Sequence, residues 1–411
     1  MAVLIGALAV ASAPAAHARP ARPQKAARLP AYGTLWITAT FLGSISRYAP
    51  PTANISQTAV ATISGSNTTL DDPNGLAIDH QGRLWVANSS ANSIVVFAAN
   101  ANGNATPVIT IAGSKTGLNQ PIAVALTQRG DVWVANDGVN TIVEFSAGAQ
   151  GNVAPIRTIA GSNTALSDLS GIAVSPEGTR VWVSEYRSRS QTPSLNEYAG
   201  SAHGDAKPLV QISGPDTKLN DPNGITVGVD GNDPTTVNYV AGSSGLLRFA
   251  PGARGDAKPT VVSGFNTGIE LPVLQALDAV GDIWVPSAEN SEVARFGPTA
   301  HGNAVPERLF LDRTSNPGSI AVFMAPPSAP RAVHAKATTK KLHLTWSTPK
   351  VKGGGILGYQ VRDRKKSGHW KVVKTTTKPS YTKSHPHKGF SYDVIAFNEA
   401  GYSTASSSIR P

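Results

Sequence analysis

Residues 84–107 read LWVANSSANSIVVFAANANGNATP, and residues 132–155 read VWVANDGVNTIVEFSAGAQGNVAP. Both stretches contain two runs rich in β-branched and aromatic residues, separated by a polar turn, and both end in a Gly-Asn turn before a proline. Such runs, bounded by turn residues, are typical of short antiparallel strands. A segment that recurs after 48 residues indicates a repeat architecture, in which each unit buries its faces against its neighbours.

The same pattern recurs along most of the chain, with large aromatic residues at fixed places. The first set is Trp36, Trp85, Trp133, Trp182, Tyr239 and Trp284, and the second set is Tyr48, Phe97, Phe145, Tyr198, Phe249 and Phe296. We expect these rings to pack between adjacent sheets, because large side chains bury the most area. Four strand-like runs per copy and six copies predict an all-β fold, a six-bladed β-propeller over residues 34–324.

The count of strands predicts how the ring closes. The first copy has the second, third and fourth strands of a blade but no first strand, and the missing strand follows the last complete unit, at Asn316–Met324. We therefore predict one blade shared by both ends of the repeat region, which removes an exposed sheet edge.

The pattern W-V-A-[ND]…N-x-I-x-x-F, present at Trp85–Phe97 and Trp133–Phe145, resembles NHL-repeat propellers. More loosely, it resembles the six-bladed gluconolactonase-like and virginiamycin-lyase-like propellers. NHL repeats usually carry an arginine before the isoleucine, where this chain has Ser93 and Thr141. We therefore expect no nucleic-acid partner.

A second domain follows a linker at residues 325–330, APPSAP. Residues 331–411 contain 16 Lys or Arg against 3 Asp or Glu, whereas residues 35–330 contain 16 against 23. The runs KLHLTWSTP, LGYQVRDRK and FSYDVIAFNEAGYSTAS alternate as strands of a β-sandwich do. This segment closely resembles a fibronectin type III domain, and the matching residues are Trp346, Tyr359, Tyr392, Val394, Ala396, Asn398, Gly401 and Ser403. The resemblance implies a spacer or weak ligand module of a secreted carbohydrate-acting or surface-binding protein.

The N-terminus predicts export. Residues 1–18 form an apolar run that ends at Ala16-His17-Ala18, as a secretory signal peptide does. A signal anchor is the alternative, but the run is shorter than the roughly 20 residues that span a bilayer. Residues 19–33 are a basic, Pro-rich linker, and the chain contains no Cys, which excludes disulfides and Cys-ligated metals. We expect a secreted bacterial monomer with no transmembrane segment, free or attached to the envelope.

Candidate binding residues come from the channel mouth where each first strand begins and each second strand ends. They are Asn74, Asn88, Asn136, Ser170, Glu185 and Asn223, together with Arg187 and Arg189 in an enlarged turn that opens on the same mouth. Asn88, Asn136 and Glu185 occupy one repeat position in successive blades, and their oxygens suit Ca²⁺ or Mg²⁺. The resemblance to gluconolactonase-like propellers implies such a metal. The alternative is that asparagine at a strand end only caps a turn.

No complete catalytic set is recognised, so no catalytic residue is assigned. His80, His203 and His301 lie on turns at the opposite side, away from the mouth where a lyase would need its base. We expect a non-enzymatic binding or scaffold protein, whose propeller mouth binds an unidentified ligand and whose basic module contacts acidic envelope polymer or polysaccharide. A solubilising surface is the alternative for the basic face. The alternative function is a divalent-metal-dependent hydrolase that acts on a lactone or glycan.

Overall fold

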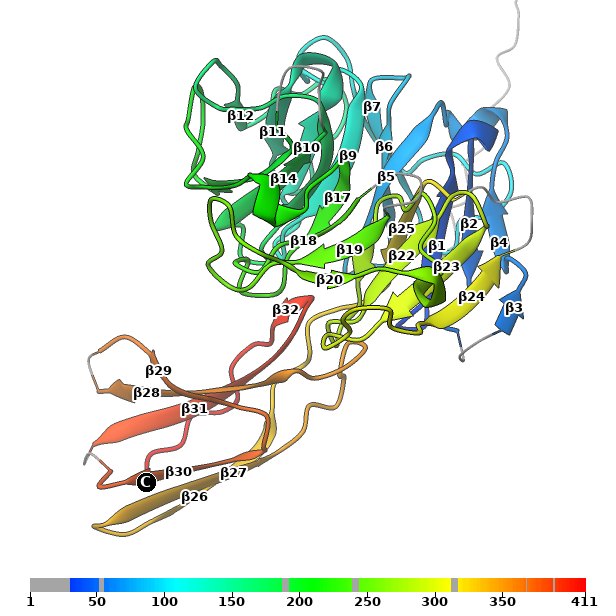
Figure 1. The fold of residues 1–411 in the computed structure, drawn as a ribbon. Helices are drawn as coiled ribbons and strands as arrows, with labels where there is room; N and C mark the ends of the chain where they lie inside the picture. The colour runs from blue at the N-terminus through cyan, green and yellow to red at the C-terminus, as the bar shows by residue number, and fades with distance from the viewer. Residues whose placement is uncertain are drawn as a thin grey trace, which may run out of the picture.

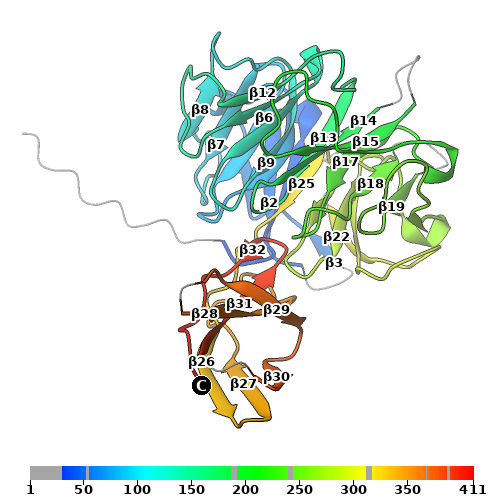
Figure 2. The ribbon, with the colours of Figure 1, turned by 90° about the vertical axis from the view of Figure 1, so that its left-hand side faces the viewer.

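The structure, a computed structural model, describes residues 30–51, 55–186, 192–238, 244–311, 317–366, 368–386 and 389–411. The predicted signal peptide and most of the basic linker therefore lie outside the described residues. Six sheets surround a central axis, and a smaller β-sandwich lies beside one end of that axis (Figures 1 and 2). The described residues contain no helix that is long and apolar enough to span a membrane.

Each blade is an antiparallel sheet in which strand order follows the path from the axis outward. Blade 1 contains β25 (Ser319–Val322), β1 (Leu35–Ala39), β2 (Ser44–Tyr48) and β4 (Ala61–Ile63). Blade 2 contains β5 (Pro73–Ile78), β6 (Leu84–Asn88), β7 (Ser93–Phe97) and β8 (Ile109–Ala112). Blade 3 contains β9 (Pro121–Leu126), β10 (Val132–Asn136), β11 (Thr141–Phe145) and β12 (Arg157–Ile159).

The other three blades repeat this order. Blade 4 contains β13 (Leu169–Val174), β14 (Arg180–Glu185), β15 (Ser194–Ala199) and β16 (Val210–Ile212). Blade 5 contains β17 (Pro222–Thr226), β18 (Thr235–Asn238), β19 (Gly245–Arg248) and β20 (Thr260–Val262). Blade 6 contains β21 (Ala276–Leu277), β22 (Ile283–Ser287), β23 (Glu292–Phe296) and β24 (Glu307–Leu311), with β3 (Ile55–Gln57) added at its outer edge. Short 3-10 turns are η1 (Thr40–Leu42), η2 (Ser66–Thr68), η3 (Asp137–Val139), η4 (Pro215–Thr217) and η5 (Phe265–Thr267).

The predicted shared blade is confirmed. Strand β25 pairs antiparallel with β1, with Val322 opposite Leu35 and Ser319 opposite Thr38. Backbone hydrogen bonds continue past both ends of this pairing, from Gly318 N–H to Thr38 (2.8 Å) and from Phe323 N–H to Thr34 (2.9 Å). The first-strand position of blade 1 is therefore filled by chain from the far end of the propeller.

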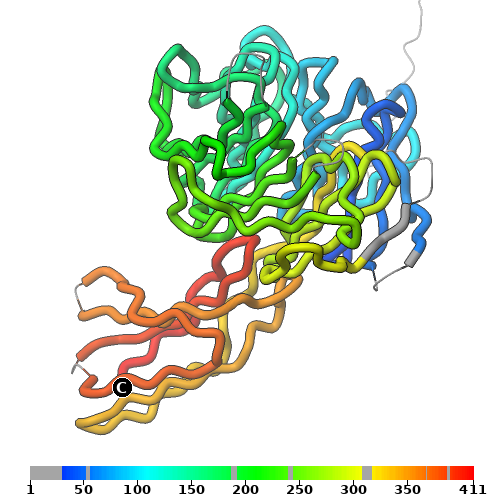
Figure 3. Tube along the Cα trace, viewed as in Figure 1, coloured from blue at the N-terminus to red at the C-terminus, as the bar shows by residue number. Residues whose placement is uncertain are grey.

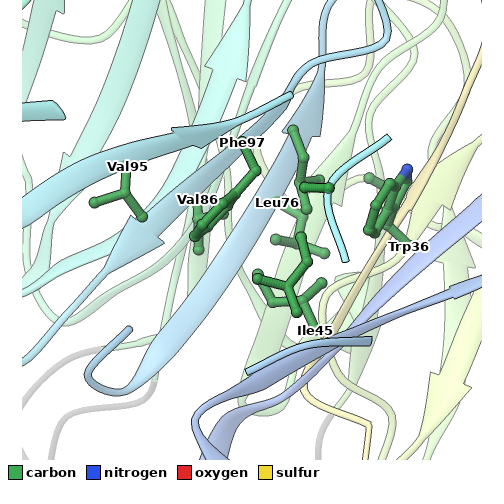
Figure 4. Packing of buried hydrophobic residues seen from close by; sticks show 10 residues of the cluster. Trp36, Ile45, Leu76, Val86, Val95 and Phe97 are labelled. Carbon is green, nitrogen blue, oxygen red and sulfur yellow. The ribbon is translucent and has the colours of Figure 1, made fainter. Parts of the chain in front are cut away.

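The described aromatic anchors pack between blades as predicted. Trp36, in blade 1, contacts a cluster that contains Leu76, Val86 and Phe97 of blade 2 (Figure 4). Five further clusters join the remaining pairs of neighbouring blades, including blade 6 with blade 1. All described anchors are at most 5% exposed, and truncating one such ring to alanine costs about 3–5 kcal/mol. Tyr239 lies outside the described residues.

The repeated Gly-Asn or Gly-Asp turn connects each blade to the preceding one. The Gly103 backbone bonds to the β4 edge of blade 1 in parallel fashion, and the Asn104 carboxamide accepts the Asn67 N–H at 2.6 Å. The same pair of contacts recurs at the turns that begin at Gly151, Gly204, Gly255 and Gly302. These glycines have φ between +59° and +72°, a region open to glycine at little cost. The sequence between β2 and β4 contains no glycine, and β3, which lies in that connection, pairs with β24 at the edge of blade 6.

The C-terminal sandwich consists of two sheets. One sheet contains β26 (Arg331–Ala337), β27 (Lys341–Ser347) and β30 (Ser380–Ser384). The other contains β29 (Lys371–Thr376), β28 (Gly358–Lys365), β31 (Phe390–Asn398) and β32 (Gly401–Tyr402). Trp346 and Tyr359 meet edge to face at 5.4 Å in the core between the sheets. The tip between β31 and β32 reaches the propeller (Figure 3), and the loop at Gly354 and Gly355 also packs against Ala279 and Val280 of the propeller.

Candidate functional site

The channel of the propeller has two different ends. We call the end where the first strands begin, at Pro73, Pro121 and Pro222, the upper end, and the end where they turn into the second strands the lower end. The sequence-predicted site residues belong to the upper end. The lower end faces the sandwich.

At the upper end, the asparagines of the repeat are hydrogen-bonded within their own blades. Asn136 is fully buried; its oxygen accepts the Asn119 N–H at 3.2 Å, and its amide group donates to Gly117 (3.0 Å) and Thr141 (3.1 Å). Asn88 is also fully buried and bonds to the corresponding residues of blade 2, Asp71, Thr69 and Ser93. Their side chains thus close the loop that precedes each first strand, as the turn-capping alternative describes.

Glu185 is 3% exposed and is held in the same way. Its two carboxylate oxygens accept hydrogen bonds from Ser194 (2.9 Å) and Asn196 (2.7 Å). Burial raises the pKa of Glu185 to about 7, although these hydrogen bonds favour the ionised form. No three His, Asp or Glu of the described ranges come together as a metal site. Ca²⁺ or Mg²⁺ at Asn88, Asn136 and Glu185 stays a prediction.

The other predicted site residues are dispersed. Ser170 is fully buried and donates to the Pro222 carbonyl at 2.6 Å, which joins blade 4 to blade 5. Asn223 is 6% exposed within β17, and Asn74 is half-buried on β5. Arg187 and Arg189 lie outside the described residues.

Close backbone contacts narrow the channel toward the upper end. A Cβ on Gly171 would lie 2.6 Å from the Gly224 Cα, and one on Gly75 would lie 2.6 Å from the Ala123 Cα. Only glycine permits such an approach between neighbouring first strands. The space that these residues enclose is about 40 Å³.

The lower end opens into a cavity of about 660 Å³, which we call the lower cavity. First strands of all six blades contribute to its wall, and the apolar side chains include Leu76, Val124, Val174, Val227, Leu277 and Val322. Met324, Glu399 and Ala400 complete its rim, so the wall is built from both domains.

The tip of the β31–β32 hairpin is fixed to the propeller by polar contacts. The Val229 N–H donates to the Glu399 carboxylate at 2.6 Å. The Gln128 amide group donates to the Tyr402 carbonyl at 2.8 Å and accepts its N–H at 3.3 Å. The Tyr402 hydroxyl donates to Asp230 at 3.0 Å. The hairpin therefore lies at the lower end in a defined position, below the blades in Figure 2.

Three polar side chains on the cavity wall have unused hydrogen-bonding capacity. The Gln128 backbone acts on the His80 ring, although neither ring nitrogen has a partner at ordinary hydrogen-bond geometry among the described residues, and burial lowers the pKa of His80. The Gln275 side chain is 6% exposed, and its oxygen has no partner in the described part of the chain. Burial also raises the pKa of Glu399 to about 7.

The sequence pattern places His80 on the lower side correctly, but it predicts the binding site at the upper end of the channel. Glu399 was visible only as part of the fibronectin-like run, because its role depends on where the second domain docks. The signal that could have located this tip is the stretch Asn398-Glu399-Ala400-Gly401, because asparagine and glycine favour a tight turn between two strands.

The chain is similar to known proteins in both of its domains. The family model for the fibronectin type III domain matches residues 328–411. The nidogen/laminin complex structure is 14% identical with a TM-score of 0.51, over 70% of this chain and 97% of that chain, a likeness that shows the fold alone. Virginiamycin B lyase from Staphylococcus aureus is 15% identical with a TM-score of 0.45, over 78% of this chain and 90% of that chain. No curated protein sequence matches significantly. This chain is an all-β protein in which a six-bladed propeller is followed by a domain that matches the fibronectin type III family model.

Proposed function

We propose that this chain is a secreted binding protein that takes a small, largely apolar ligand into the lower cavity. The observation that supports this most is the cavity itself, whose wall combines apolar side chains of the inner strands with polar and charged side chains, among them His80, Gln275 and Glu399. Small-molecule sites are usually preformed hollows of roughly 300–1,000 Å³ with this kind of lining. In this function the fibronectin type III domain completes the site and is more than a spacer.

A neutral fluorescent dye, Nile red, tests the proposal on the full chain. Thr226 lines the cavity at the end of β17 and belongs to no core cluster, so Thr226→Trp should fill the cavity and abolish dye binding. Thr260→Trp is the matched control, since Thr260 lies on the exposed outer strand of the same blade. Saturable binding with one dye per chain, lost only in Thr226→Trp, is expected. Binding that is absent, or equal in both variants, would reject the proposal.

A second function, attachment to acidic polysaccharide, is favoured by the charge of the sandwich. Among its described residues, ion pairs join only Arg362 to Asp393 and Lys383 to Asp363. The Arg364 guanidinium, on β28, lies 4.4 Å from the centre of the Trp370 ring. It adds a positive charge to the sheet that contains β28 and β29. Such a surface attracts polyanions through a field that salt screens.

Retention of the full chain on immobilised alginate measures this second function. Lys374→Glu, on the exposed strand β29, should shift elution to clearly lower salt, whereas Lys115→Glu, a charge-matched change on the propeller, should not. Equal shifts would show that only net charge matters. The metal-dependent hydrolase is not proposed, because the side chains of Asn88 and Asn136 are used within turns.

A further inference from the structure

Glu399 is an acidic group on the wall of a cavity whose inner strands contribute apolar side chains and whose turns contribute polar ones. It is half-buried at the tip of the β31–β32 hairpin and lies on the rim of the lower cavity. One carboxylate oxygen accepts the Val229 N–H at 2.6 Å. The other lies 3.5 Å from where a Cβ on Gly281 would be, so its neighbour there is a glycine with no side chain.

No cation of the described chain pairs with Glu399. The charged groups that act on it from the propeller are Asp230, Asp233 and Asp278, and all of them disfavour its ionised form. Asp278 is itself paired with Arg295 at 3.2 Å. The carboxylate therefore adds negative charge to a region that is already acidic.

The two arginines of the cavity wall are already occupied. Arg83 pairs with Asp79 at 2.6 Å, and that carboxylate also accepts the Trp85 indole N–H at 3.0 Å. Arg129 is mostly exposed, lies 3.7 Å from Asp131 and donates to the Glu177 carbonyl. Neither arginine is thus available to neutralise Glu399.

A partly buried carboxylate without a counter-ion is less stable than one that is paired with a cation. We propose that the lower cavity accepts an organic cation, with its ammonium group at Glu399 and its apolar body along the inner strands. This inference rests on the proposed function and names the chemical class of its ligand. Attraction between opposite charges is strong where water is partly excluded, so Glu399 provides selectivity over a neutral molecule of the same shape.

Displacement of Nile red by two matched probes, n-octylammonium and n-octanol, tests the inference on the full chain. At pH 8 the ammonium probe should displace the dye at a concentration about tenfold lower than octanol, as expected for one partly desolvated charge pair. Its advantage should shrink toward pH 6, where Glu399 is mostly protonated. Equal potency of the two probes would overturn the inference while leaving the cavity function intact, whereas failure of the dye to bind would overturn the cavity function.

Three variants test whether the preference for the ammonium probe comes from the Glu399 carboxylate. Glu399→Gln keeps an oxygen for the Val229 N–H and should remove the ammonium advantage without changing octanol. Glu177→Gln, a charge-matched change at an exposed position of the lower end, should retain it. Tyr402→Phe weakens the hairpin contact but keeps the carboxylate. If Tyr402→Phe loses the advantage as fully as Glu399→Gln, the assignment to Glu399 is wrong.

Discussion

The two ends of the channel each contain a glutamate whose pKa burial raises to about 7, yet the two carboxylates differ in their partners. Both oxygens of Glu185 accept side-chain hydrogen bonds inside blade 4. Glu399 accepts one backbone N–H across a domain boundary and borders the lower cavity. The carboxylate at the upper end is therefore held by side chains of its own blade, whereas the carboxylate at the lower end comes from the second domain and borders a cavity.

The largest expected loss of stability comes from a substitution at the upper end of the channel, where neighbouring first strands touch. Gly171→Ala places a Cβ against the Gly224 backbone at 2.6 Å, and such overpacking should destabilise the protein by about 3 kcal/mol. Gly297→Ala, whose Cβ would meet its nearest atom at 3.7 Å, should stay within about 0.5 kcal/mol of the parent. Urea unfolding compares the two variants. Equal stabilities would mean that the first strands do not touch as described.

A smaller loss is expected when a repeat asparagine is removed. Asn136→Ala leaves the Asn119 N–H and the Gly117 carbonyl without their partner, which should cost about 2 kcal/mol. Asn100→Ala, at an exposed turn position, is the control and should be nearly neutral. Thermal melts of the parent and of both variants measure this loss, and melts with Ca²⁺ or with chelator should give the same Tm values. A Tm that rises with Ca²⁺ in the parent but not in Asn136→Ala would favour the predicted metal ion instead.

The sequence repeat accounts for the parts of the fold and of the candidate site that could be predicted from the sequence. Blade number, the shared blade and the buried rings follow from positions such as Trp85 and Phe97, because periodic apolar residues can be buried only between sheets. Asn88, Asn136 and Glu185 were singled out by the same periodicity, and they lie where expected. Their hydrogen-bond partners belong to loops whose geometry a single sequence does not define. Glu399 has no repeat counterpart, so only the docked hairpin reveals its environment.

The two glutamates should also make stability depend on pH. Each has a folded-state pKa raised above its value in the unfolded chain, so the folded state holds its proton more tightly. The free energy of unfolding should therefore fall as pH rises from about 4.5 to about 7, on the order of 1 kcal/mol per carboxyl. Glu185→Gln and Glu399→Gln should each flatten this part of the profile. Only Glu399→Gln should also change the pH dependence of ammonium binding; a change in both would mean that the two ends communicate.

The smallest expected effect is a change in local opening of the structure, which should differ between the two ends of the channel. Tyr402→Phe removes the hydroxyl that donates to Asp230 at 3.0 Å but keeps the ring that lies 5.7 Å from Phe397. An exposed hydrogen bond of this kind contributes about 0.5 kcal/mol, so the Val229 amide, protected by Glu399, should exchange its hydrogen about twofold faster. The Asp71 amide, bonded to Asn88 at the upper end, should be unaffected, because the hairpin can open without disturbing the blades. Equal acceleration at both amides would show that hairpin docking and blade packing open together, and the lower end would then be as much a part of the folded core as the upper end.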